Sequence, residues 1–417
     1  MVILMSGLDY SQAPIELREQ LSFTRAQVGA LVGRIRAQNL RILGCALIST
    51  CNRTELYLSC APESDLKPDE ILCGAVGLEY APFAGAFVTR RGSAAARHLM
   101  EVAGGLKSQI WGEDQIISQV KAAIGIAREQ GTADPVLETL FRNAVAAGKE
   151  IKTKVRLTGV ATSAAARAVD VLRRDMGKLD GKRALVIGNG EMGRLSASLL
   201  REAGCSVTVT LRTYRHGETV VPAGCGVVPY DDRFSAMEGM DLVLSATTSP
   251  HYTVTAEQMS MLKRRPSWVV DLSMPRDVDA GVEALPGITL YNVDTLGAEQ
   301  HRGEIPVEVL DILDDYMGRF YEWHNYRKCL PAIENLKEAI TERVLTYPEL
   351  EDGLEQEELV ELTVSKAVDL LTGGLKEHFT PEDLERVVGK IKVHTAVRSR
   401  ERENCHGEKR ILFPAIC

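Results

Sequence analysis

The chain has 417 residues, more than one hydrophobic core usually supports, so two or three domains are expected. Hydrophobic residues make up 45% of the sequence and charged residues 25%, which is typical of a soluble globular protein. The formal net charge of -8 argues against a dedicated nucleic-acid binder, because such proteins are usually basic. The opening "MVILMSGLDY" lacks the basic region and cleavage site of a signal peptide, and no apolar run approaches the ~18 residues of a membrane span. We therefore expect a cytoplasmic protein without membrane contact.

Residues 1–155 predict a small α+β domain. The expected strands are 1–8, 45–51, 54–60 and 87–92, and the expected helices are 14–23, 24–38, 93–106, 112–130 and 136–155. Strands and helices in this order are typical of an α+β sandwich. The basic stretch "KEIKTKVR" at 149–156 is a candidate patch for nucleic acid, although a solvated helix face is the more common meaning of such a pattern.

Residues 156–300 predict a doubly wound parallel sheet. A buried strand, a glycine turn and a helix that Gly204 closes are followed by strands that alternate with helices. The expected strands are 184–187, 205–211, 225–230, 241–247, 268–273 and 288–293. This order indicates a Rossmann-type domain.

The glycine turn of this domain has the sequence Gly188-Asn189-Gly190-Glu191-Met192-Gly193. In the G-x-G-x-x-G motif the first two glycines permit a tight turn and close approach of the backbone to a pyrophosphate, and the third lets helix and strand pack. The strand before it and the helix after it are the context that the motif requires. We predict a dinucleotide site at these six residues, against the alternative of a structural glycine turn.

The end of the next strand, "TLRTYR", indicates which dinucleotide binds. An NAD site usually has a carboxylate there to bond the ribose 2′-hydroxyl. This chain instead carries Arg212, Thr213 and Arg215, whose positive charges suit a 2′-phosphate. We therefore predict NADPH as the cofactor, with two solvated arginines as the alternative.

Residues 301–417 predict an all-helical region. Leu310, Leu313, Met317 and Phe320 recur at helical spacing. Pro331 is expected to end or kink this helix, so that a second helix begins near Ile333. Further helices are expected to about residue 390, with apolar stripes that serve packing or dimerisation.

Cys51 is the residue of the sequence most suggestive of chemistry. The nine cysteines form no Cys-x-x-Cys pair and no zinc spacing, so neither a disulfide framework nor a metal site is expected. Cys51 lies at a strand end, and Arg53, two residues on, could lower its pKa or bind a substrate carboxylate. A thiol that captures an acyl group beside a hydride donor describes reduction of that acyl group to an aldehyde. Taken alone, Cys51 could also be a buried, inert cysteine.

Six segments occur in the same order as in the glutamyl-tRNA reductase family, and residues 1 to about 345 resemble it: "STCNRTELY", "GEDQIISQVKAA", "VIGNGEMG", "SATTSPH", "DLSMPRDVD" and "LYNVDTL". The resemblance implies a catalytic domain at 1–155, an NADPH-binding domain at 156–300 and a helical domain at 301–417, with a spinal helix and a dimerisation region. It implies reduction of glutamyl-tRNA to glutamate-1-semialdehyde through a cysteine thioester, the first step of five-carbon tetrapyrrole (porphyrin and heme) synthesis. The implied partners are glutamyl-tRNA, a second copy of the chain and the aminomutase that follows.

Carried over by position, the resemblance makes Cys51 the nucleophile and His98 the histidine on which the family's activity depends. It implies substrate contacts at Thr50, Asn52, Arg53, Glu55, Ser108, Glu113, Asp114, Gln115 and Gln119, with Arg53 on the α-carboxylate of the glutamyl group. The sequence departs from the family pattern at Tyr10, which replaces a histidine, at Gly104 and Lys107, which replace serine and aspartate, and at Asp114, which replaces proline.

Two alternatives stay open at this point. One is another NADPH dehydrogenase of the shikimate-dehydrogenase type, which would need a catalytic Lys/Asp pair and would leave the thiol segment idle. The other is a non-catalytic paralogue that binds tRNA or the aminomutase as a regulator.

Overall fold

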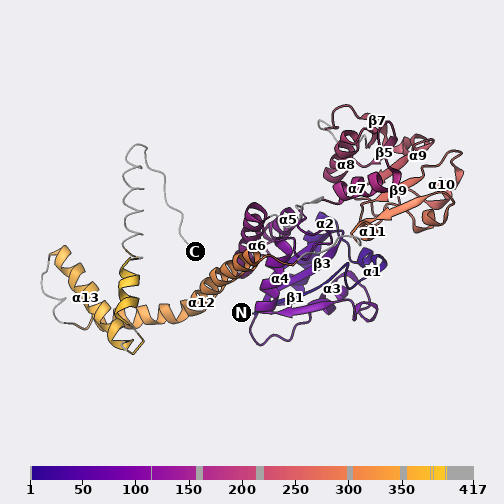
Figure 1. Ribbon diagram of the computed structural model, residues 1–417. Helices are drawn as coiled ribbons and strands as arrows, with labels where there is room; N and C mark the ends of the chain where they lie inside the picture. Colours follow the sequence, from indigo (N-terminus) through magenta and orange to yellow (C-terminus); the bar gives the residue numbers. More distant parts are fainter. Residues whose placement is uncertain are drawn as a thin grey trace. The chain divides into compact units, whose positions relative to one another are not determined.

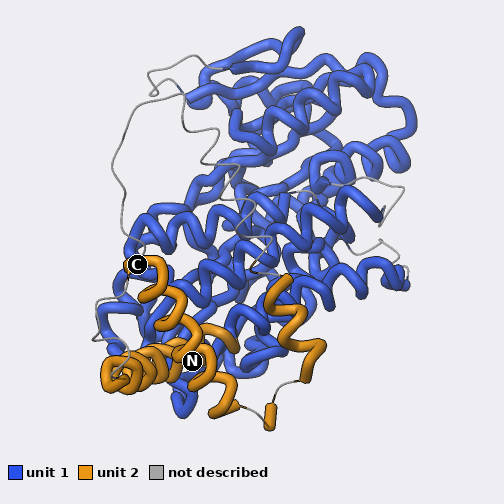
Figure 2. The backbone as a smooth tube through the Cα atoms, turned by 90° about the vertical axis from the view of Figure 1, so that its left-hand side faces the viewer, with its two compact units in different colours: residues 1–324 blue, residues 325–417 orange. Residues whose placement is uncertain are grey.

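The computed structural model describes residues 2–113, 115–155, 163–212, 220–297, 304–347, 355–375, 377–378, 380–389 and 391. The chain separates into two compact units, residues 1–324 and residues 325–417 (Figure 2). The first unit contains two sheets with their covering helices, and the second is helical where it is described (Figure 1).

The N-terminal sheet is antiparallel, with the order β2-β3-β1-β4. Its strands are β1 (Val2–Asp9), β2 (Ile42–Ser49), β3 (Arg53–Cys60) and β4 (Val88–Arg91). The helices of this part are α1 (Ile15–Gln20), α2 (Arg25–Gln38), α3 (Pro68–Val76), α4 (Ser93–Ala103), α5 (Gln115–Glu129) and α6 (Pro135–Lys154). The predicted α+β class is confirmed, and α3 is an addition to the predicted helices.

Both faces of this sheet are covered, because alternate residues of each strand enter different cores. Leu4 and Leu56 pack with residues of α2 and α3, whereas Met5 and Tyr57 pack with residues of α4, α5 and α6. The hairpin between β2 and β3 is therefore fixed from both sides by buried strands.

The second sheet is parallel, with the order β10-β9-β8-β5-β6-β7. Its strands are β5 (Arg183–Ile187), β6 (Ser206–Leu211), β7 (Gly226–Pro229), β8 (Leu242–Ser245), β9 (Trp268–Asp271) and β10 (Thr289–Asn292). The helices are α7 (Ala164–Met176), α8 (Glu191–Glu202), α9 (Arg233–Met237), α10 (Ala256–Met261) and α11 (Val293–Gly297). The strand order reverses between β5 and β8, where a doubly wound sheet binds its ligand. The predicted Rossmann-type sheet is confirmed.

The helical region begins with α12 (Val307–Val344), which is followed by α13 (Gln356–Gly374). Val309, Leu313 and Phe320 at the start of α12 join the core above α4, α5 and α6. The prediction that a second helix begins after Pro331 is wrong, because Pro331 lies inside the single helix α12. Proline removes one intrahelical hydrogen bond, and the neighbouring turns on both sides keep the helix continuous here. Among the described helices, none combines the length and the apolar character that crossing a bilayer requires.

Candidate active site

Cys51 lies in the turn between β2 and β3. The amide of Thr50 donates to the carbonyl of Arg53 at 2.9 Å, and this bond closes the turn. The hydroxyl oxygen of Thr50 accepts hydrogen bonds from the amides of Asn52 at 3.1 Å and Arg53 at 3.2 Å. The oxygen of Thr50 thus shapes the turn that presents the thiol, and its contact with the substrate stays a prediction.

The thiol of Cys51 differs from most other described thiols in its exposure. Cys45, Cys60, Cys73 and Cys205 are buried, whereas Cys51 is half-buried. Burial still raises the pKa of Cys51 to about 12, and the Glu113 carboxylate adds to this rise while Arg18 opposes it. The thiol is therefore protonated at neutral pH in this arrangement.

The side chain of Arg53 does not serve the thiol. Its Nη1 donates to Oε1 of Glu55 at 2.7 Å and lies 4.0 Å from Oδ2 of Asp9, and its Nη2 donates to the carbonyl of Lys107. Arg53 is only 2% exposed. Of the two roles considered for Arg53, lowering the pKa of the thiol has no support here, because the cation that opposes the rise at Cys51 is Arg18.

Glu55 forms the centre of a buried network. Its Oε1 lies 2.8 Å from Nε2 of His98, and its Oε2 accepts the hydroxyl of Tyr57 at 2.8 Å. Burial alone would raise the pKa of Glu55, yet its interactions with His98 and Arg53 together hold it well below its usual range. Glu55 is thus an ionised carboxylate that orients His98. The bonds from Arg53, His98 and Tyr57 occupy this carboxylate and compete with its predicted contact with the substrate.

Unsatisfied polar atoms gather near the thiol turn. Among the described residues, Nδ1 of His98, Oδ1 of Asn52, Oγ of Ser108 and Oε1 of Gln109 are buried without a hydrogen-bond partner. Tyr10 links two of these segments, because its amide donates to the Asn52 carbonyl at 3.0 Å and its hydroxyl to the Ser108 carbonyl at 3.4 Å. Buried polar atoms normally have partners, so this set is suited to the polar groups of a ligand.

The remaining predicted substrate residues have different settings. Glu113 is buried and acts electrostatically on Cys51. Gln115 and Gln119 lie half-buried on the first turns of α5. Asp114 lies outside the described residues. Gln109 and Arg18 were missed by sequence reasoning, because the contacts that give them a role are with residues far away along the chain.

The glycine turn lies at the reversal point of the parallel sheet. Gly188 has φ +106°, and a Cβ there would stand 2.4 Å from the Ala246 carbonyl oxygen. A Cβ at Gly193 would stand 2.0 Å from the Gly188 carbonyl oxygen, so helix α8 packs closely on β5. A Cβ at Gly190 would meet no atom within 4 Å. The backbone at Gly190, at the N-terminus of α8, is thus open for a pyrophosphate, and these residues fit a dinucleotide.

The other residues of this predicted site vary in position. Glu191 and Met192 form the first turn of α8, and Asn189 donates to the Val220 carbonyl at 3.1 Å. The guanidinium of Arg212 lies 4.3 Å from the ring centroid of Tyr230, which holds it at the end of β6. The sequence did not predict the contact of Tyr230 with Arg212, because the pairing of β6 with β7 brings the two residues together. Thr213 and Arg215 lie outside the described residues.

A second buried polar centre lies at the ends of β8 and β9. Asp277 accepts hydrogen bonds from Oγ of Ser245 at 2.6 Å, Oγ of Ser273 at 2.5 Å, and the amide and hydroxyl of Thr247 at 2.9 and 2.6 Å. Burial and the charge of Asp277 raise the pKa of Asp271 to about 7. This centre fixes the start of the "TTSPH" loop, which follows β8 beside Gly188.

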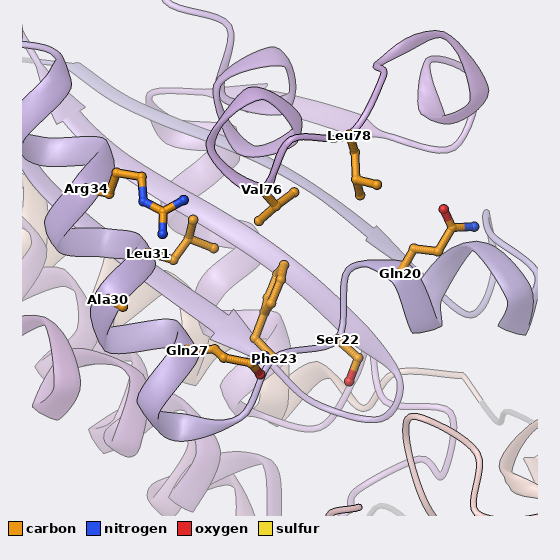
Figure 3. A pocket seen from close by; sticks show the side chains of 9 residues that line it. All are labelled: Gln20, Ser22, Phe23, Gln27, Ala30, Leu31, Arg34, Val76 and Leu78. Atoms are coloured by element: carbon orange, nitrogen blue, oxygen red, sulfur yellow. The ribbon is translucent and has the colours of Figure 1, made fainter. Parts of the chain in front are cut away.

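A pocket of about 380 Å³ lies between α2 and the end of α3 (Figure 3). Its floor is formed by Phe23, Leu31, Val76 and Leu78, and Arg34 donates to the Ala75 carbonyl at its edge. No predicted site residue lines it. We assign this pocket no part in the chemistry.

The fold and the site define a dinucleotide-binding oxidoreductase with a separate, cysteine-bearing α+β domain. The family profile described as "Glutamyl-tRNAGlu reductase, N-terminal domain" matches residues 6–155, and that of "Shikimate / quinate 5-dehydrogenase" matches residues 170–298. The second profile covers the parallel sheet without the thiol domain, so it does not favour the shikimate-dehydrogenase alternative.

Two curated glutamyl-tRNA reductases are similar over nearly their whole length. The protein from Acetivibrio thermocellus is 42% identical over 333 residues, covering 79% of this chain and 99% of that one. The protein from Alkaliphilus oremlandii is 40% identical over 337 residues, covering 80% and 100%. The chain belongs to the glutamyl-tRNA reductase family. The solved structure of glutamyl-tRNA reductase from Methanopyrus kandleri is 28% identical, covers 93% of this chain and 97% of that one, and has a TM-score of 0.46.

Proposed function

We propose that this protein reduces the glutamyl group of glutamyl-tRNA to glutamate-1-semialdehyde with NADPH, the first step of five-carbon tetrapyrrole synthesis. The observation that carries the proposal is the half-buried Cys51 thiol in a turn held by two buried strands, with buried polar atoms on the linked segments that have no partner among the described residues. The names of the similar curated proteins supply the substrate class. We place the reaction in the cytoplasm, where charged tRNA is made.

The chemistry begins with loss of the Cys51 proton. The sulfur attacks the carbonyl carbon of the glutamyl ester, the C–O bond to the tRNA ribose breaks, and the ribose oxygen leaves with a proton. Nδ1 of His98 is buried without a partner in the described structure, and we assign it a proton-transfer or polarising role at this carbonyl. NADPH, when bound, supplies the hydride that converts the thioester into aldehyde and free thiolate, and it leaves as NADP⁺.

The glutamyl group fixes which carboxylate the protein recognises. Its α-carboxyl is the esterified, reacting group, so the free carboxylate is that of the side chain, which corrects the expected contact of Arg53 with the α-carboxylate. A guanidinium has five N–H donors, and two of those of Arg53 are used by Glu55 and Lys107. We therefore keep Arg53 as a candidate for the side-chain carboxylate, with Asn52, Ser108, Glu113, Gln115 and Gln119 around the glutamyl group.

One feature supports NADPH rather than NADH, and a second supports a dinucleotide of either kind. The exposed Arg212 lies at the end of β6, and Tyr230 holds its guanidinium by a cation–π contact of 4.3 Å. Asn189, Gly190 and the N-terminus of α8 lie at the turn that would take the pyrophosphate. We assign the adenosine 2′-phosphate to Arg212, and Thr213 and Arg215 remain predicted contacts.

The domain division and the assembly are also proposals. We divide the chain into residues 1–155, 156–300 and 301–417, which agrees with the two profile matches. On α13, Val360, Val364 and Val368 form a stripe that is 56%, 56% and 49% exposed. A stripe at this spacing suits the same helix of a second copy, so we propose a homodimer through the helical domain. Transfer of the aldehyde to the aminomutase remains a prediction from the family.

The test follows NADPH oxidation with charged glutamyl-tRNA as substrate and free glutamate as control. We expect turnover by the wild type, none by Cys51→Ser, and full turnover by Cys225→Ser, a matched change at another half-buried cysteine. Turnover that survives Cys51→Ser contradicts the thioester. A silent wild type that still binds tRNA contradicts the enzyme and supports the regulatory paralogue.

A further inference from the structure

Helix α1 connects the thiol domain to the dinucleotide-binding domain by charged side chains. It is only six residues long, Ile15–Gln20, and three of these residues are Glu16, Arg18 and Glu19. Each of the three contacts a residue more than 250 positions later in the chain. Figure 1 shows α1 beside α11, the helix that follows β10. Neither the glycine turn nor the thiol chemistry explains these contacts.

Arg18 makes the contact closest to the thiol. Its Nη1 donates to the carbonyl of Cys51 at 2.8 Å, and its Nη2 lies 2.5 Å from both carboxylate oxygens of Asp294 on α11. Nε donates to the carbonyl of Ala13 at 3.2 Å. Arg18 is 2% exposed, so its guanidinium depends on these protein partners. One guanidinium therefore joins the turn that carries the thiol to the domain that carries the glycine turn.

Gln109 strengthens the same junction. Its Nε2 donates to the carbonyl of Asp294 at 3.2 Å and lies 3.5 Å from Oδ1. Gln109 comes from the segment that also holds Ser108, one of the predicted substrate residues. Asp294 is thus held by two side chains of the thiol domain.

Glu19 and Glu16 make a second, independent contact of opposite polarity. Glu19 accepts from Nε and Nη2 of Arg276 at 2.8 and 2.9 Å and from its amide at 2.8 Å. Nη1 of Arg276 lies 3.3 Å from Glu16. The side chains of Arg276 and Glu19 are 13% and 17% exposed, unlike the surface pair Arg25–Glu129 at 61% and 58%. Partly buried, multiply bonded pairs of this kind fix geometry, whereas exposed pairs contribute little.

The two contacts use motifs that the chemistry leaves without a role. Arg276 belongs to "DLSMPRDVD" and Asp294 to "LYNVDTL", two of the segments that carry the family resemblance. On α1, the cation Arg18 pairs with the acid Asp294 of the other domain. The acids Glu16 and Glu19 pair with the cation Arg276 of that same domain. This crossed arrangement specifies one register between the two surfaces, because any shift brings like charges together.

We propose that α1 is the docking element for the dinucleotide-binding domain and that Arg18 is a positioning residue, which sets the Cys51 turn against that domain for hydride transfer. The inference rests on the proposed function. Formation of the thioester needs only the thiol domain and the acceptor end of the tRNA. Reduction needs a hydride donor held at a fixed distance from the thioester carbon. Loss of the docking contacts therefore slows reduction and leaves acylation intact.

The test reverses the charges of the pair that lies away from the thiol, with Glu19→Arg, Arg276→Glu and the double variant, in the full chain. Acylation is measured without NADPH as labelled glutamate bound to protein, and reduction as its release after NADPH is added. We expect acylation within about twofold of wild type in all variants and reduction slowed by about tenfold or more in each single variant. The double variant recovers most of the rate. The matched reversal at the exposed pair, Arg25→Glu with Glu129→Arg, leaves both steps unchanged.

The neutral variant Glu19→Gln serves where a reversal prevents folding, and a fluorescence titration with NADPH shows that the cofactor still binds. Reduction at the wild-type rate in the single variants contradicts the inference, as does acylation that falls in parallel with reduction. If the wild type itself forms no thioester, the proposed function fails. Docking is then decided by small-angle scattering of the full chain, in which each single reversal increases the radius of gyration and the double variant restores it. Equal radii in all variants contradict docking.

Discussion

The two polar centres of the first unit bury carboxylates in opposite electrostatic surroundings. Glu55 lies against the guanidinium of Arg53 and the imidazole of His98, and the pKa of its carboxyl is well below the usual range. Asp271 lies near a second carboxylate, Asp277, and its pKa is raised to about 7. Both residues are nearly inaccessible, at 1% and 2% exposure. Burial raises the pKa in both cases, so the charge of the neighbours decides the outcome.

The difference shows how the two halves of the site are built. The thiol domain keeps full charges in its interior and needs each partner to balance them. The dinucleotide-binding domain presents open backbone at Gly190 and lets hydroxyl groups and amides hold its buried acid Asp277. The thiol domain is therefore sensitive to substitutions that remove a charge. The dinucleotide-binding domain is sensitive to substitutions that add side-chain volume.

The largest effect is expected from Arg53→Leu. This change leaves the ionised Glu55 without its buried cation, which should lower the free energy of unfolding by about 3 kcal/mol or more. Because the pKa of Glu55 is lowered by folding, its contribution to stability is present above the unfolded pKa of about 4.3 and is lost as pH falls below it. Urea unfolding should therefore show a large deficit at pH 7. An equal stability of variant and wild type at pH 7 contradicts the network.

Asp271→Asn should have the opposite dependence on pH. The folded pKa of about 7 exceeds the unfolded value of about 3.9, so the wild type loses stability from this group as pH rises between the two. About 2 kcal/mol of this loss falls between pH 5 and pH 7. The asparagine variant lacks this loss, so its stability relative to wild type should improve from pH 5 to pH 7. The matched control is Asp170→Asn, at a side chain that is 38% exposed, and an identical pH dependence of all three proteins contradicts the assignment.

The glycine turn gives a pair of changes that separates folding from binding. Gly193→Ala places a Cβ against the Gly188 carbonyl oxygen and should destabilise the domain by about 2 kcal/mol. Gly190→Ala enters open space, so unfolding should change by less than about 1 kcal/mol while NADPH affinity falls. The measurements are thermal unfolding and a fluorescence titration with NADPH. Equal effects of the two changes on stability and on NADPH affinity would contradict the separate roles of Gly193 in packing and Gly190 in binding.

The smallest effect concerns the choice of cofactor. Arg212→Gln should reduce the preference for NADPH over NADH by about tenfold, the worth of roughly 1.4 kcal/mol in binding. Tyr230→Leu should have a weaker effect in the same direction, because it removes the ring that holds the guanidinium. The ratio of kcat/KM for the two cofactors measures both. An unchanged ratio in Arg212→Gln would mean that residues other than Arg212 bind the 2′-phosphate.

Much of this architecture follows from local sequence patterns. We could predict the apolar strands, the glycine turn at Gly188 and the hairpin around Cys51, because residues close together in the sequence determine each of them. The contacts of Arg18 with Asp294, of Glu55 with His98 and of Arg212 with Tyr230 could not, because strand pairing and domain contact bring these residues together. The helix through Pro331 shows the same limit, since the turns on either side outweigh the local penalty.

The most direct test of the account is the mass of the intact protein after mixing with glutamyl-tRNA in the absence of NADPH. We predict a single glutamyl adduct on Cys51, absent in Cys51→Ser and discharged as the aldehyde when NADPH is added. An adduct on another residue, or aldehyde formation by a wild type that never carries the adduct, would contradict the central claim.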